Sequence, residues 1–63
     1  MDKKKSLAID FIANAIESFW ETQDFEYAEF ARGAAEMAYL LECINLKELK
    51  EINHQIEEIE EDL

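Results

Sequence analysis

Apolar residues recur at intervals of three and four along almost the whole chain, and no proline interrupts the pattern. This spacing places side chains on one face of an α-helix, with successive members one turn apart. Good helix formers dominate, and the chain has a single glycine. The sequence therefore predicts an all-α fold, a small antiparallel arrangement of three helices over about residues 6–21, 25–43 and 46–61.

We expect the first helix to begin at Ser6, which can act as its N-cap. A flexible basic tail over residues 1–5 would precede a single helical domain over residues 6–63. The apolar arc of this helix is wider than the roughly 100° of an ordinary surface helix, which predicts contact with more than one neighbour. We assign to the core or to a dimer interface Ile12, Ile16, Phe19 and Trp20.

The second helix follows Asp24, a suitable N-cap. Its apolar stripe alternates between intervals of three and four, as in a heptad, and small residues within it would let helices approach closely. Gly33 lies in the same helix, where it costs about 1 kcal/mol relative to alanine, and close packing would offset this. In this helix, the residues that we assign to the core or to a dimer interface are Phe30, Ala34, Met37 and Leu41.

The boundary between the second and third helices depends on Asn45. Asn45 with Glu48 three residues later matches a capping box and predicts a break in the helix. The alternative is one helix over residues 25–61, giving a hairpin that dimerises into a four-helix bundle. Beyond the break, a narrow stripe resembles a coiled-coil seam among charged residues: Leu49, Ile52, Ile56, Ile59 and Leu63.

A chain of 63 residues can bury only a small core, so it usually needs a disulfide, a metal or a partner. Its one cysteine and one histidine cannot make an internal disulfide or a zinc cluster. We therefore expect a homodimer, forming a helical bundle through the apolar arc of the first helix and the alanine-lined face of the second.

The chain carries 16 acidic and 6 basic residues, a net charge of −10. A body this negative repels phosphate backbones, so we do not expect direct binding to nucleic acid. Asp10, Asn14 and Glu17 interrupt the only stretch that resembles a signal peptide. No apolar run is long enough to span a membrane, and a cytoplasmic location without membrane contact is expected.

No group of residues indicates catalysis. Cys43 lacks a base, and the adjacent Glu42 opposes formation of a thiolate, so we expect a half-buried apolar role. Glu51 and His54 match the Glu-x-x-His spacing of di-iron bundles, but His54 points away from the isoleucine stripe. We expect no enzymatic activity, no bound metal and no cofactor.

Two surfaces are candidates for binding a protein. The side of the second helix opposite its stripe places tyrosine and arginine among small residues, as in an interface hot spot. The alternative is that this side packs on another helix. The second candidate is an acid strip on the first helix, whose members are one turn apart. The first surface comprises Phe25, Arg32, Ala35 and Tyr39, and the second comprises Asp10, Asn14, Glu17 and Glu21.

These features together predict a non-enzymatic interaction module, a small acidic inhibitor or regulator that binds a protein target. In size and composition the chain resembles accessory proteins encoded by phages and other mobile elements. One alternative is a DNA mimic, such as an anti-CRISPR or anti-restriction inhibitor, whose acid strip occupies a basic nucleic-acid-binding groove. Another is a subunit of a self-assembling helical bundle, and an ordinary solvated face would also account for the acid strip.

Overall fold

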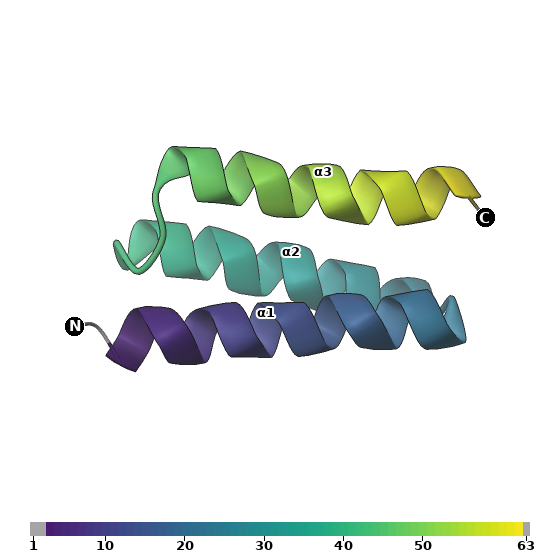
Figure 1. Cartoon of the computed structure of the whole chain (residues 1–63), viewed down its shortest axis with the longest axis horizontal. Coiled ribbons are helices and arrows are strands. Elements are labelled where there is room, and N and C mark those ends of the chain that lie inside the picture. The colour runs from purple at the N-terminus through teal and green to yellow at the C-terminus, as the bar shows by residue number, and fades with distance from the viewer. Residues whose placement is uncertain (1–2, 63) are drawn as a thin grey trace.

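A computed structural model describes residues 3–62 of the chain. Three helices make up the fold: α1 (Lys3–Thr22), α2 (Phe25–Leu40) and α3 (Leu46–Asp62). Each runs antiparallel to the one before it, and α2 contacts both of the others (Figure 1). The prediction of a small all-α, three-helix arrangement is confirmed, whereas dimerisation stays a prediction.

The start of α1 differs from the prediction. The helix begins at Lys3, so Ser6 lies within it and residues 3–5 are helical instead of forming a tail. Lysine is a good helix former, and the Lys5 Nζ lies 3.2 Å from the Glu48 Oε2 on α3. Residues 1 and 2 of the expected tail lie outside the described residues.

A tight turn joins α1 to α2. Gln23 adopts a left-handed conformation with φ 59°, and its N–H donates to the Phe19 carbonyl at 2.8 Å, an αL helix end. The Asp24 carboxylate then accepts a hydrogen bond from the Glu26 N–H at 3.0 Å. This confirms Asp24 as the N-cap of α2.

The end of α2 is a Schellman motif. The N–H of Cys43 donates to the Ala38 carbonyl at 2.7 Å, and that of Glu42 to the Tyr39 carbonyl at 3.0 Å. Glu42 takes the left-handed position that glycine usually occupies, with φ 61°. These bonds end α2 at Leu40, three residues earlier than predicted.

The break at Asn45 is confirmed, and the alternative of one helix over residues 25–61 is wrong. The Asn45 Oδ1 accepts from the Glu48 N–H, and the Glu48 Oε1 accepts from the Asn45 N–H, both at 2.9 Å. This is the reciprocal capping box. The backbone bond to Asn45 and the nearby Lys5 together lower the pKa of Glu48.

A line of alanines on α2 forms the centre of the core. These alanines recur at intervals of three and four, and all are buried. Side chains this small let helices pack closely. Phe19 and Ile12 of α1 and Ile56 of α3 are the largest fully buried side chains, and they pack against this alanine line, which consists of Ala28, Ala31, Ala35 and Ala38.

The predicted apolar stripe of α3 faces inward. Ile56 is fully buried, while Leu49, Ile52 and Ile59 are partly buried against the core clusters. Leu63, the last member of the stripe, lies outside the described residues. Across residues 3–62, each helix is too short or too polar to cross a lipid bilayer.

Candidate protein-binding surface

The predicted stripe of α2 faces outward. Phe30 is 60% exposed, Met37 56% and Leu41 66%, while Ala34 is half-buried. The assignment of the three large residues to a core within one chain is therefore wrong. The alanine line lies beside them on the helix and occupies the contact with α1 and α3, because its small side chains permit closer packing. A dimer interface at these residues stays a prediction.

Helix α1 adds two large side chains next to this stripe. Leu7 and Phe11 are separated by one helical turn, and both are mostly exposed. Sequence reasoning placed both in the wide arc of the first helix but did not single them out. We call the combined surface the outer face, and it consists of Leu7, Phe11, Tyr27, Phe30, Met37 and Leu41.

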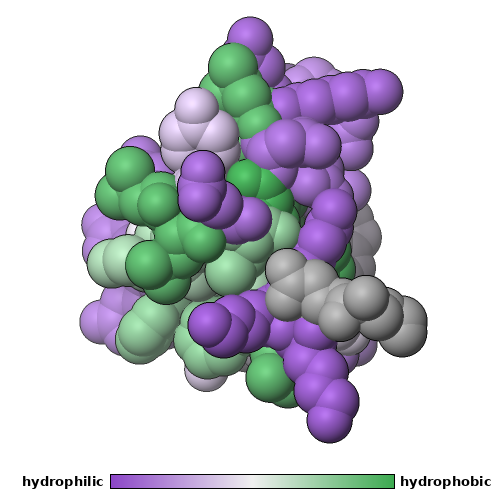
Figure 2. All heavy atoms as spheres, turned by 90° about the vertical axis from the view of Figure 1, so that its left-hand side faces the viewer, coloured by the Kyte–Doolittle hydropathy of each residue, from purple (hydrophilic) through white to green (hydrophobic). Residues whose placement is uncertain are grey.

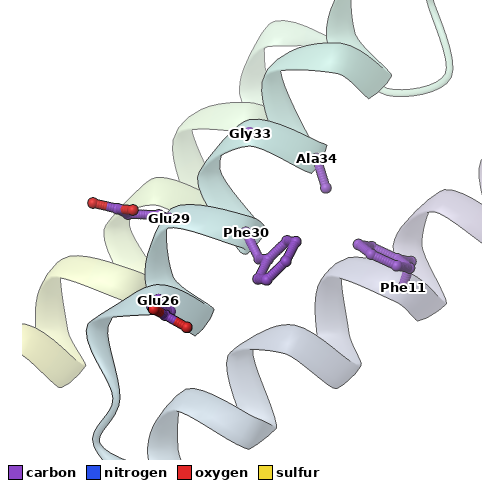
Figure 3. A pocket seen from close by; sticks show the side chains of 6 residues that line it. All are labelled: Phe11, Glu26, Glu29, Phe30, Gly33 and Ala34. Atoms are coloured by element: carbon purple, nitrogen blue, oxygen red, sulfur yellow. The ribbon is translucent and has the colours of Figure 1, made fainter.

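The outer face is hollowed between α1 and α2. Figure 3 shows Phe30 and Ala34 of α2 pointing toward Phe11 of α1. The open hollow between these helices has a volume of about 610 Å³, and none of its lining residues comes from α3. Gly33 forms part of the wall, and a Cβ added there would meet nothing within 4 Å. The expected close packing at Gly33 is therefore absent within the described chain.

Both helices that form the outer face also carry exposed acidic side chains. Glu26 and Glu29 line the hollow together with Phe11 and Phe30, and Figure 3 shows Glu29 pointing away from α1. All the carboxylates of these two helices are exposed. The ion pairs Lys5–Glu48 and Arg32–Glu60 and the His54–Glu58 contact do not involve them. The carboxylates on α1 are called the α1 row and consist of Asp10, Glu17 and Glu21. Those on α2 are called the α2 row and consist of Glu26, Glu29 and Glu36.

Two of the four α2 residues predicted to bind a partner are instead occupied within the fold. Ala35 is fully buried, so the assignment of Ala35 to a partner surface is wrong for this fold. Arg32 donates to Glu60 of α3, which raises the pKa of Arg32 and lowers that of Glu60. The alternative that this side packs on another helix therefore holds for Ala35 and Arg32.

Phe25 and Tyr39, from the same predicted surface, remain partly exposed. The centroid of the Phe25 ring lies 5.6 Å from that of the buried Phe19 ring, so one side of the Phe25 ring packs against Phe19. Tyr39 lines a shallow hollow with Leu40 and Leu46 at the end of the molecule where α2 leads into α3. Figure 2 shows hydrophobic surface gathered on one side of this end, with hydrophilic surface on the other.

The residues predicted for the core or dimer interface of α1 divide into two groups. Ile12 and Phe19 are buried and Ile16 is half-buried, so these three belong to the core. Trp20 is exposed and belongs to neither core cluster of the described residues. The acid strip of α1, including Asn14, lies entirely on the solvent side.

The polar residues considered for chemistry do not come together in one site. Cys43 is half-buried, with its Sγ 3.9 Å from the Leu41 carbonyl oxygen. The His54 Nε2 lies 2.7 Å from the Glu58 Oε1 on the exposed side of α3. Within residues 3–62, no three His, Cys, Asp or Glu side chains come together as a metal site.

Comparisons with protein-family models, curated proteins and solved structures gave no match for this chain.

Proposed function

We propose that this protein is a non-enzymatic interaction module that binds a protein target with its outer face. The observation that carries the proposal is the outward stripe of α2, in which Phe30, Met37 and Leu41 are all more than half exposed. Contiguous apolar patches of this kind mark interaction sites in small folded proteins. A protein that binds in this way acts by occupying a surface of its target, as small inhibitors and regulators do.

The energetics favour coverage of the outer face. Burying one Phe or Leu side chain fully contributes about 1.5–3 kcal/mol, so coverage of Phe11 and Phe30 would stabilise a complex substantially. A stable interface takes about 800 Å² from each partner. That is roughly one-sixth of the 4776 Å² that this chain exposes. An interface of that size would cover the outer face together with polar surface around it.

Site-specific photocrosslinking tests the proposal. A photoreactive benzoyl-phenylalanine replaces Phe30 in one variant and Leu46, another exposed apolar residue, in the control. In cells that naturally contain this protein, we expect position 30 to give one defined adduct that position 46 does not give. Adding Phe11→Ser and Met37→Ser should remove the adduct without loss of helical circular dichroism. Equal adducts at both positions, or only an adduct of twice the 7.4 kDa chain, would contradict target binding.

The exposed acid strip of α1 supports a second candidate, a DNA mimic. Asp10, Glu17 and Glu21 are exposed, with Asp10 about two turns from Glu17 and Glu17 about one turn from Glu21, so their charges form a ladder. In this alternative, the target would be a nucleic-acid-binding protein, and affinity would fall steeply with salt. Glu17→Gln with Glu21→Gln should then weaken the complex strongly, whereas Phe30→Ser should leave it unchanged.

A further inference from the structure

The hollow of the outer face forms an apolar groove, and the α1 row and the α2 row are its two acidic borders. This combination restricts which partner can bind there. Building on the proposed function, we propose that the outer face binds an amphipathic helix whose apolar stripe is flanked by lysine and arginine. The proposal names the class of partner, which the function stated above leaves open.

The dimensions and composition of the groove suit a helix. The α2 side of the outer face extends from Tyr27 to Leu41, about 21 Å at 1.5 Å per residue, which equals about four turns of a partner helix. The groove lies between two antiparallel helices, with Phe11 and Phe30 on either side of the hollow. An apolar helix face laid into a groove is a recurrent mode of peptide recognition. Gly33 leaves room in the wall for a large partner side chain.

The borders of the groove determine which charge the partner helix carries. On α1, Asp10 follows Leu7 by three residues, and on α2, Glu26 precedes Phe30 by four. Residues at these intervals are neighbours on a helix surface, about 5–6 Å apart. A helix seated in the groove would therefore place one flank beside Asp10 and the other beside Glu26 and Glu29, the two glutamates that line the hollow. Basic flanks would be attracted to both rows, and acidic flanks would be repelled by both.

The same borders disfavour a second copy of this chain. Both rows are acidic, and each chain carries a net charge of −10. A copy packed face to face would bring acidic rows together, and like charges placed opposite one another oppose association. The charge pattern therefore favours a basic helix over self-association.

Designed peptides test the proposal directly. Three helical peptides share one leucine stripe and differ only at the flanking positions, which are lysine, serine or glutamate. Isothermal titration calorimetry against the full chain at low salt should give the tightest binding for the lysine peptide and the weakest for the glutamate peptide. A scrambled lysine peptide of identical composition should bind at least about tenfold more weakly, because it lacks the apolar stripe.

Matched variants locate the binding site. Phe30→Ser should weaken the lysine peptide about tenfold, whereas Leu46→Ser should not. Glu26→Gln with Glu29→Gln should weaken it several-fold at low salt, and this difference should vanish in about 1 M salt. The control is Glu57→Gln with Glu61→Gln on α3, which removes the same charge from exposed positions away from the groove.

The outcomes separate this proposal from the function on which it rests. If all three amphipathic peptides bind with equal affinity and Phe30→Ser weakens their binding, the proposal of a basic partner is overturned but the outer face remains a docking site. Equal weakening by the two glutamine pairs would overturn the role of the acidic borders. No effect of Phe30→Ser would overturn docking at the outer face itself. A dimer in sedimentation analysis that Phe30→Ser converts to monomer would assign the face to a second copy and overturn the peptide-helix proposal.

Discussion

Arg32 on α2 donates two hydrogen bonds to Glu60 on α3, from Nη1 to Oε2 at 3.0 Å and from Nη2 to Oε1 at 2.5 Å. This fork geometry makes arginine–carboxylate pairs stronger than single contacts. Lys5 and Glu48 join α1 to the other end of α3. The two pairs therefore hold α3 to the α1–α2 pair near both of its ends.

Glu60→Gln should lower the free energy of unfolding at pH 7 by up to about 1 kcal/mol, because the pair is partly exposed to solvent. Urea titration followed by circular dichroism measures the change. Glu61→Gln removes the same charge from an exposed neighbour and should have a smaller effect. An equal effect of the two substitutions would show that total charge matters more than the Arg32 contact.

The effect of Glu60→Gln should also depend on pH. Arg32 lowers the pKa of Glu60 below its usual 4.5. A carboxyl group whose pKa is lower in the folded protein than in the unfolded chain stabilises the fold at pH values above its pKa in the unfolded chain. This stabilisation is lost as the pH falls through the pKa of the folded state. The difference between the wild type and Glu60→Gln should therefore be complete at pH 7 and shrink below pH 4.5. A difference that stays constant down to pH 3 would contradict the ionic character of the contact.

Glu42→Gly should stabilise the protein by about 1 kcal/mol, because a left-handed residue other than glycine costs about 1–2 kcal/mol. Glu42 has φ 61° at the end of α2. Glu42→Gln serves as the control, since it removes the charge near the helix C-terminus but keeps the Cβ. The glycine variant should be the more stable of the two in thermal unfolding, and an equal gain would assign the effect to charge alone.

Ala35→Leu should destabilise the protein by about 1–3 kcal/mol, because added methylenes overpack a filled core. Ala35 is fully buried in the alanine line. Ala13→Leu makes the same change at an exposed position of α1 and should alter stability by no more than about 0.5 kcal/mol. Denaturant midpoints of the two variants provide the comparison. A tolerated Ala35→Leu would indicate that α2 does not bury this face.

Gly33→Ala should stabilise the isolated chain by about 0.5–1 kcal/mol, the usual gain for replacing glycine inside a helix. The added Cβ has nothing within 4 Å to clash with. The same methyl group would narrow the hollow beside Phe30, so binding of a large partner side chain should weaken. Thermal unfolding and peptide titration of one variant measure both effects. A loss of stability that grows with protein concentration would instead reveal a second copy packed over Gly33.

Local sequence chemistry determined the helices and the turn between α2 and α3. Asp24 and the Asn45–Glu48 pair satisfy backbone groups within three residues of themselves, so a capping pattern can be read without tertiary information. The isoleucine stripe of α3 was equally readable, because nearly all the other positions of that helix are charged or polar. The early start at Lys3 was missed because the Lys5 contact with Glu48 joins residues far apart in the sequence.

Only the tertiary structure decided which side of α2 is buried. A hydrophobic pattern ranks Phe30 and Met37 above alanine, so it predicts that the large residues point inward. Close packing of α2 against two helices instead selects the smallest side chains, and Ala31 and Ala35 take the contact. The large side chains are left beside that contact, on the outer face. The sequence by itself determined that α2 carries both large apolar residues and small ones, and the packing of three helices decided that the alanines are buried and the large residues stay exposed.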